Sequence, residues 1–73
     1  MNMKDFLAEM KDVLQTETEI TSETILADLE EWDSLSIMAT MALLNKSFGV
    51  KTSLKDYKDK KTIGEIAKMA GIL

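Results

Sequence analysis

The sequence predicts an all-α domain, a four-helix bundle with a long loop between its first two helices and a short third helix. Two observations carry this prediction. Proline is absent and the three glycines (Gly49, Gly64 and Gly71) lie far apart, so helices can run without interruption. Apolar residues recur at helical spacing, and no segment shows the alternation expected of a strand. The 73 residues fit a single domain over positions 1–73.

The first helix is predicted at about residues 3–15. Phe6, Met10 and Val13 repeat at helical spacing with Leu7 and Leu14 beside them, while charged residues take the other face. Residues 16–33 then lack a sustained period. Their scattered apolar side chains, at Ile20, Ile25, Leu26 and Leu29, indicate a long loop pinned to the core, with at most one short turn. Long loops in compact domains are often functional.

The second helix begins at Asp33 or Ser34, which are both good N-cap residues, and ends at Phe48 before Gly49. Eight of the ten residues from Leu35 to Leu44 are apolar, more than one buried stripe requires. So small a domain cannot bury this helix on every side. We therefore expect water or a partner to contact some of the following: Leu35, Met38, Ala39 and Ala42.

Two shorter helices follow. A weaker start signal at Ser53 predicts a third helix of about residues 53–58. Thr62 and Glu65 have the spacing of a capping box, in which each side chain accepts a hydrogen bond from the other residue's backbone amide. The fourth helix then places Ile63, Ile66, Ala67 and Ala70 on one face and ends near Gly71.

Composition excludes several functions. Residues 1–33 hold ten Asp or Glu against two Lys, a net charge of −8, and residues 34–73 hold three acids against seven Lys, a net charge of +4. An acidic first half and the lack of Arg argue against nucleic-acid binding. The chain has no Cys and no His, so disulfides and Ser–His or Cys–His catalysis are impossible, and we expect no enzyme.

The sequence also argues against a metal site and against a membrane span. Asp28, Glu30 and Asp33 do not fit the spacing of a calcium loop, because Trp32 and Ala39 stand where that loop needs acids. We expect no metal site. The longest apolar stretch, from Ile37 to Leu44, is too short to span a bilayer. The missing cysteines and the absence of a signal-peptide pattern fit a cytoplasmic protein.

The segment from Glu30 to Leu35 contains the candidate site. Asp33-Ser34-Leu35 on its own is an ordinary helix start, in which Ser34 would be a capping or first-turn residue. At a helix N-terminus, however, free amides and the dipole would also stabilise a phosphodiester on Ser34.

The chain resembles the acyl carrier protein family over nearly its whole length. Asp33-Ser34-Leu35, Phe48-Gly49-Val50 and Lys61-Thr62-Ile63-Gly64-Glu65 occur in the family's order and at family-like distances. The resemblance implies that Ser34 carries 4′-phosphopantetheine, attached from coenzyme A by a phosphopantetheinyl transferase, with Asp33 and Leu35 as recognition residues. It also implies partners that load and transfer acyl groups, such as a ligase or synthase and acyl-transfer enzymes, as in fatty acid or polyketide biosynthesis.

Alternatives to an acyl carrier are an aminoacyl or peptidyl carrier, and an unmodified helical adaptor that binds through the apolar second helix. We expect a monomer, although a homodimer through that helix is an alternative. The family's growing chains can fold between the helices, so Met10, Met38, Met41 and Leu44 either line such a space or fill the core, and we favour core filling.

The chain departs from the family in two places. Fatty-acid carriers usually present acids on the second helix, whereas residues 34–48 contain none; Ser36, Ala39, Asn45 and Lys46 stand at positions that tend to be acidic. Trp32 replaces a commonly small residue, and it either anchors the loop against the second helix or contacts the partner or the arm. Together with Leu35, Met38, Ala39 and Ala42, Trp32 forms the predicted docking set. Charge complementarity selects partners, so both departures predict a specialised carrier.

Overall fold

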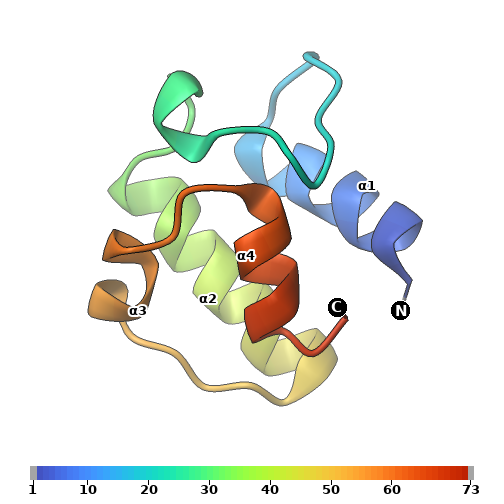
Figure 1. Ribbon diagram of the computed structural model, residues 1–73. Coiled ribbons are helices and arrows are strands. Elements are labelled where there is room, and N and C mark those ends of the chain that lie inside the picture. Colours follow the sequence, from blue (N-terminus) through green and yellow to red (C-terminus); the bar gives the residue numbers. More distant parts are fainter. Residues whose placement is uncertain (1, 73) are drawn as a thin grey trace.

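The computed structural model describes residues 2–72 and is helical, as predicted (Figure 1). Its elements in order are α1 (Met3–Leu14), the 3₁₀ turn η1 (Leu26–Asp28), α2 (Ser34–Phe48), α3 (Leu54–Lys58) and α4 (Ile63–Met69). The predicted bounds agree to within a few residues, and η1 is the short turn expected in the long loop. No strand occurs in this range, only an isolated bridge that pairs Ile25 with Thr62.

Helix α1 buries a face that differs slightly from the predicted one. Its buried residues are Phe6, Met10 and Leu14, each four residues after the last, while Val13 is only half-buried. Because an α-helix has 3.6 residues per turn, side chains spaced by four lie nearly above one another and form a narrow stripe on one face. Val13 therefore lies beside the core-facing edge, where it contributes to a groove described below.

The long loop is held to the start of α4 by backbone hydrogen bonds. The amide of Leu26 donates to the carbonyl of Lys61 at 2.8 Å, and that of Gly64 donates to the carbonyl of Ser22 at 2.7 Å. The bridge turns the side chain of Ile25 outward, 49% exposed, whereas Leu26 is almost completely buried. Of the expected loop anchors, Ile20, Leu26 and Leu29 pack on the core and Ile25 does not.

Gly64 makes the close approach of the loop to α4 possible. A Cβ atom built on this residue would lie 2.8 Å from the backbone oxygen of Ser22, closer than nonbonded atoms tolerate. Only glycine fits there without moving the loop.

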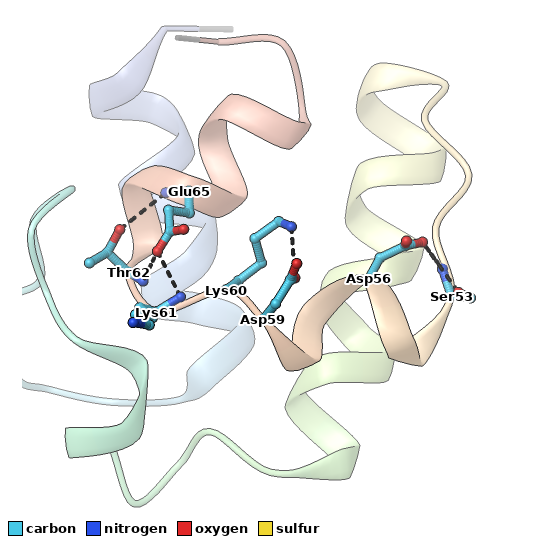
Figure 2. A network of polar contacts seen from close by, with 7 residues as sticks. All are labelled: Ser53, Asp56, Asp59, Lys60, Lys61, Thr62 and Glu65. Atoms are coloured by element: carbon cyan, nitrogen blue, oxygen red, sulfur yellow. Dashed lines mark hydrogen bonds and ion pairs between the residues drawn. The ribbon is translucent and has the colours of Figure 1, made fainter.

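Capping boxes fix both short helices in the C-terminal half (Figure 2). The amide of Glu65 donates to the Thr62 hydroxyl at 3.2 Å, and the Glu65 carboxylate accepts from the amide of Thr62 at 3.1 Å, as the sequence predicts. Before α3, the Asp56 carboxylate accepts from the amide of Ser53 at 2.7 Å. Each box satisfies amides that a helix start leaves unpaired.

The core lies between the helices and is closed. Phe6, Met10, Leu44, Ile63 and Ile66 have no exposed surface. Thr40 on α2 is also completely buried, and its hydroxyl donates to the carbonyl of Ser36 at 2.8 Å, which removes the cost of burying it. Across residues 2–72, no helix is long and apolar enough to cross a membrane.

Candidate functional site

The start of α2 is built by Asp33 and Ser36. The Asp33 carboxylate accepts from the amide of Ser36 at 3.0 Å, and the Ser36 hydroxyl accepts from the amide of Asp33 at 2.9 Å. Asp33 is therefore the N-cap and Ser36 its reciprocal partner. Ser36 is buried while it does this, so the box also anchors the helix start against the protein.

Ser34 takes no part in this box. It is the first helical residue of α2 and is exposed. Its neighbours do the capping, and within residues 2–72 its hydroxyl is not needed for any hydrogen bond that holds the fold. Of the two ordinary roles considered for Ser34, the capping role is wrong, because Asp33 is the N-cap, and the first-turn position is what the structure shows. A free, exposed hydroxyl on the first turn of a 15-residue helix fits the attachment of a phosphodiester, which the helix dipole would stabilise.

A groove of about 420 Å³ runs from Ser34 toward α3, and we call it the α2–α3 groove. Its walls are mostly apolar. The loop supplies Leu26, Ala27 and Trp32, α2 supplies Ser34 and Ile37, and α3 with the turn after it supplies Leu54, Tyr57, Lys58 and Lys60.

Trp32 links the loop to this groove. Its ring is half-buried and packs on the core, in agreement with an anchoring role. The ring also approaches that of Tyr57 on α3, with centroids 6.3 Å apart and planes inclined by 54°. Because Trp32 lines the α2–α3 groove as well, anchoring the loop does not exclude contact with a ligand there.

Tyr57 closes the floor of the groove. The residue is buried, and its hydroxyl lies 2.7 Å from that of Thr52. Burial raises the pKa of Tyr57 above its ordinary value, against the opposing effect of the hydrogen bond with Thr52. Tyr57 therefore contributes an uncharged wall to the groove below the ordinary pKa of a phenol.

A second groove lies on the other side of the helix start, and we call it the α1–α2 groove. It has a volume of about 440 Å³. Carboxylates of Glu31 and Asp33 lie in its wall, next to Leu35 and Ala39 of α2 and Val13 of α1. Ser34 therefore stands between two grooves of different polarity.

The outer face of α2 is apolar and exposed. Leu35 is 78% exposed and Met38 57% exposed, and Ala39 and Ala42 are exposed beside them. We call these residues the α2 ridge. The surplus of apolar residues in α2 thus lies on the surface, as the sequence predicts, and it adjoins Ser34.

The four residues considered as a lining for an acyl chain differ in their burial. Met10 and Leu44 are completely buried core residues and Met41 is half-buried, as expected for core filling. Core filling is wrong for Met38, which is exposed, because its position opposite the buried Thr40 and Leu44 faces away from the core.

The sequence did not single out Leu54, Tyr57, Lys58 or Lys60 as site residues. Leu54, Tyr57 and Lys58 come from a helix of five residues and Lys60 from the turn after it, and the packing of this segment against α2 has no local signature. The signal in the sequence that could have pointed to the α2–α3 groove was the pair Tyr57-Lys58, an aromatic residue next to a cation in α3. Among residues 2–72, no group of His, Cys, Asp or Glu could hold a metal ion.

In a comparison with protein families, the chain matches a family model described as the phosphopantetheine attachment site over residues 4–70. The match covers α2, α3 and α4 completely and α1 from its second residue, and it includes Ser34. No curated protein and no solved structure matches the chain significantly.

Proposed function

The chain belongs to the family of domains with a phosphopantetheine attachment site, and on that premise we propose that Ser34 is the attachment residue of an acyl carrier. Domains of this family are carriers, not enzymes, and they bear 4′-phosphopantetheine covalently. The bound group supplies a terminal thiol that holds cargo as a thioester. A chain without cysteine gains in this way the thiol that its own side chains lack.

The observation that carries the proposal is the free hydroxyl of Ser34. Asp33 and Ser36 satisfy the amides of the helix start, so modification of Ser34 removes no contact that stabilises the fold. Its exposure leaves room for the active site of a transferase. Asp33 and Leu35 flank it, and both are exposed enough to be read directly.

Loading replaces the phosphoanhydride bond of coenzyme A with a phosphoester bond to Ser34. The Ser34 oxygen attacks the phosphorus that bears the pantetheine of coenzyme A, the bond from that phosphorus to the bridging oxygen of the diphosphate breaks, and adenosine 3′,5′-bisphosphate leaves. In this proposal the serine proton passes to a base of the transferase.

The α2 ridge, with Trp32, is the proposed docking surface for the enzymes that load and unload the arm. Its exposed apolar side chains lie next to Ser34, so a partner that covers them also reaches the arm. The ridge contains no acid, which favours partners without the basic patch that fatty-acid carriers need. This supports a role in a specialised biosynthetic pathway.

Intact mass measurement tests the attachment. The protein is incubated with coenzyme A and a permissive phosphopantetheinyl transferase, and we expect a gain of one phosphopantetheine. Ser34→Ala should show no gain. Ser47→Ala is the matched control, since Ser47 is an exposed serine of the same helix, and it should load like the wild type. An equal gain in Ser34→Ala would refute the proposal.

An aminoacyl or peptidyl carrier would load identically, and the mass of the species isolated from cells distinguishes it by its cargo. The exposed α2 ridge by itself also favours a second function, that of an adaptor. An unmodified adaptor would bind its partner equally well as Ser34→Ala, and it would show no modified species in the cell.

A further inference from the structure

The methionines within residues 2–72 differ in their exposure. Met10 is completely buried, and the Thr40 hydroxyl lies 4.0 Å from its sulfur. Three others are half-buried and pack against the core: Met3, Met41 and Met69. Met38 is 57% exposed. In the part of the chain that the structure describes, Met38 is therefore the one methionine whose side chain lies mainly in solvent.

Met38 lies one helical turn after Ser34. Residues four apart on an α-helix are neighbours on its surface, and long side chains lean toward the N-terminus of their helix. The Met38 side chain therefore covers the turn of α2 that carries Ser34 and Leu35. Leu35 is itself 78% exposed, so the two apolar side chains adjoin the serine on the same surface. An enzyme that reaches Ser34 over the α2 ridge buries the thioether of Met38.

Oxidation would change the chemistry of this surface at one atom. Peroxides convert an exposed methionine to its sulfoxide, which turns an apolar side chain into a polar one. Water solvates the sulfoxide oxygen on the free protein. Beneath an apolar partner surface the oxygen would lose that water, and burying a polar group without a hydrogen bond is unfavourable. The fold would be spared, because the Met10 thioether in the core is shielded from the oxidant.

We propose that Met38 is a reversible oxidation site that controls docking on the α2 ridge. The sulfur lone pair attacks one oxygen of hydrogen peroxide, the O–O bond breaks, and the S–O bond of the sulfoxide forms. The sulfur loses two electrons, and the other oxygen leaves as water after it takes up the proton of the transferred oxygen. The inference rests on the docking surface proposed above, and it adds a condition under which loading of Ser34 stops.

Reduction reverses the change. Methionine sulfoxide reductases return the sulfoxide to the thioether, and a separate enzyme acts on each of its two epimers. A dithiol supplies the two electrons and becomes a disulfide, and the oxygen leaves as water. Oxidation at Met38 would therefore interrupt loading without destroying the carrier.

The unmodified protein suits the test because it contains no cysteine, so peroxide has no thiol to oxidise. The protein is treated with hydrogen peroxide, and catalase removes the excess before coenzyme A is added. Peptide mapping by mass spectrometry assigns the added oxygen to individual methionines, including Met1, which lies outside the described residues. Loading by a permissive phosphopantetheinyl transferase is then measured at several carrier concentrations by intact mass.

We expect Met38 to gain oxygen faster than Met10 and the half-buried methionines. Oxidation should raise the KM of the transferase for the carrier by about five- to a hundredfold, the range expected for burying one unsatisfied polar group. The value of kcat should change little, because the Ser34 hydroxyl is unaltered. The melting temperature should stay close to that of the untreated protein, and both reductases with dithiothreitol should restore the original KM.

Variants assign the effect to one sulfur atom. Met38→Leu keeps an apolar side chain of similar volume, and its KM should be the same with and without peroxide, whatever its starting value. Met38→Gln should raise KM without any oxidant. Met41→Leu is the matched control, because Met41 is a half-buried methionine of the same helix, and this variant should keep the sensitivity to peroxide.

Two results would overturn the inference. One is a peroxide effect on KM that persists in Met38→Leu, and the other is an unchanged KM in protein that is fully oxidised at Met38. Failure of the untreated protein to gain a phosphopantetheine would instead refute the attachment at Ser34, so the two proposals can be distinguished.

Discussion

Replacement of Asp33 separates its structural role from the recognition role proposed for it. Its carboxylate accepts the 3.0 Å hydrogen bond from the amide of Ser36 and so caps a helix of 15 residues. Asp33→Ala removes this acceptor, and loss of an N-cap costs about 1 kcal/mol, within a range of about 0.5–2 kcal/mol. For a domain of this size, each kcal/mol lowers the melting temperature by about 4–8 °C.

Asp33→Asn is the matched control, because Asn caps a helix about as well as Asp but carries no charge. Thermal and urea unfolding followed by circular dichroism should show a loss in Asp33→Ala and a change of only a few tenths of a kcal/mol in Asp33→Asn. If the transferase reads the carboxylate, Ser34 is loaded more slowly in both variants, including the stable one.

Two results would refute this reasoning. Wild-type stability in Asp33→Ala would show that the capping box does not stabilise α2. Wild-type loading in Asp33→Asn would show that the charge of Asp33 is not recognised, and that any slower loading of the alanine variant reflects a frayed helix start.

Three further outcomes follow from the packing. Gly64→Ala should lower the free energy of unfolding by about 1–3 kcal/mol in urea titrations, because its Cβ would lie 2.8 Å from the Ser22 oxygen; wild-type stability would contradict this. The raised pKa of Tyr57 favours the neutral phenol in the folded state. The stability that this shift contributes is complete below about pH 10 and is lost as the pH rises through the raised pKa. In unfolding titrations above about pH 10, Tyr57→Phe should therefore lose less stability with rising pH than the wild type does. The double variant Leu35→Ser, Met38→Ser should unfold within about 0.5 kcal/mol of the wild type yet bind its loading enzyme more weakly, as a binding titration would show.

Local signals in the sequence were sufficient to predict the helices. The box of Thr62 and Glu65 and the left-handed Gly49 after Phe48 act over a few residues, so their partners are visible in the sequence itself. The exposed ridge was predictable for a related reason. Eight of the ten residues from Leu35 to Leu44 are apolar, and a small bundle can cover only one face of this helix, so some of them must be exposed.

Contacts between distant segments were not predictable in this way. The choice that buries Leu26 and exposes Ile25 depends on the bridge to Thr62, 37 positions along the chain from Ile25. The grooves likewise arise where α3 and α1 lie beside α2, and five residues of α3 carry no pattern that fixes this placement. Ser34 could therefore be chosen as the candidate site from the sequence, but the charges on either side of it could not be predicted.

The position of Ser34 relative to α3 depends on a continuous set of backbone contacts that begins at Lys61, just before α4. The Lys61 carbonyl holds the amide of Leu26, the Leu26 carbonyl holds that of Leu29, and the Leu29 carbonyl holds that of Trp32. Trp32, which is two residues before Ser34, then packs near Tyr57. The long loop is thus a folded spacer rather than a free tether, and it fixes which groove the serine faces. A change at Gly64 that releases the loop would therefore alter the surroundings of Ser34 without touching it, and loading or cargo retention would respond before the helices unfold.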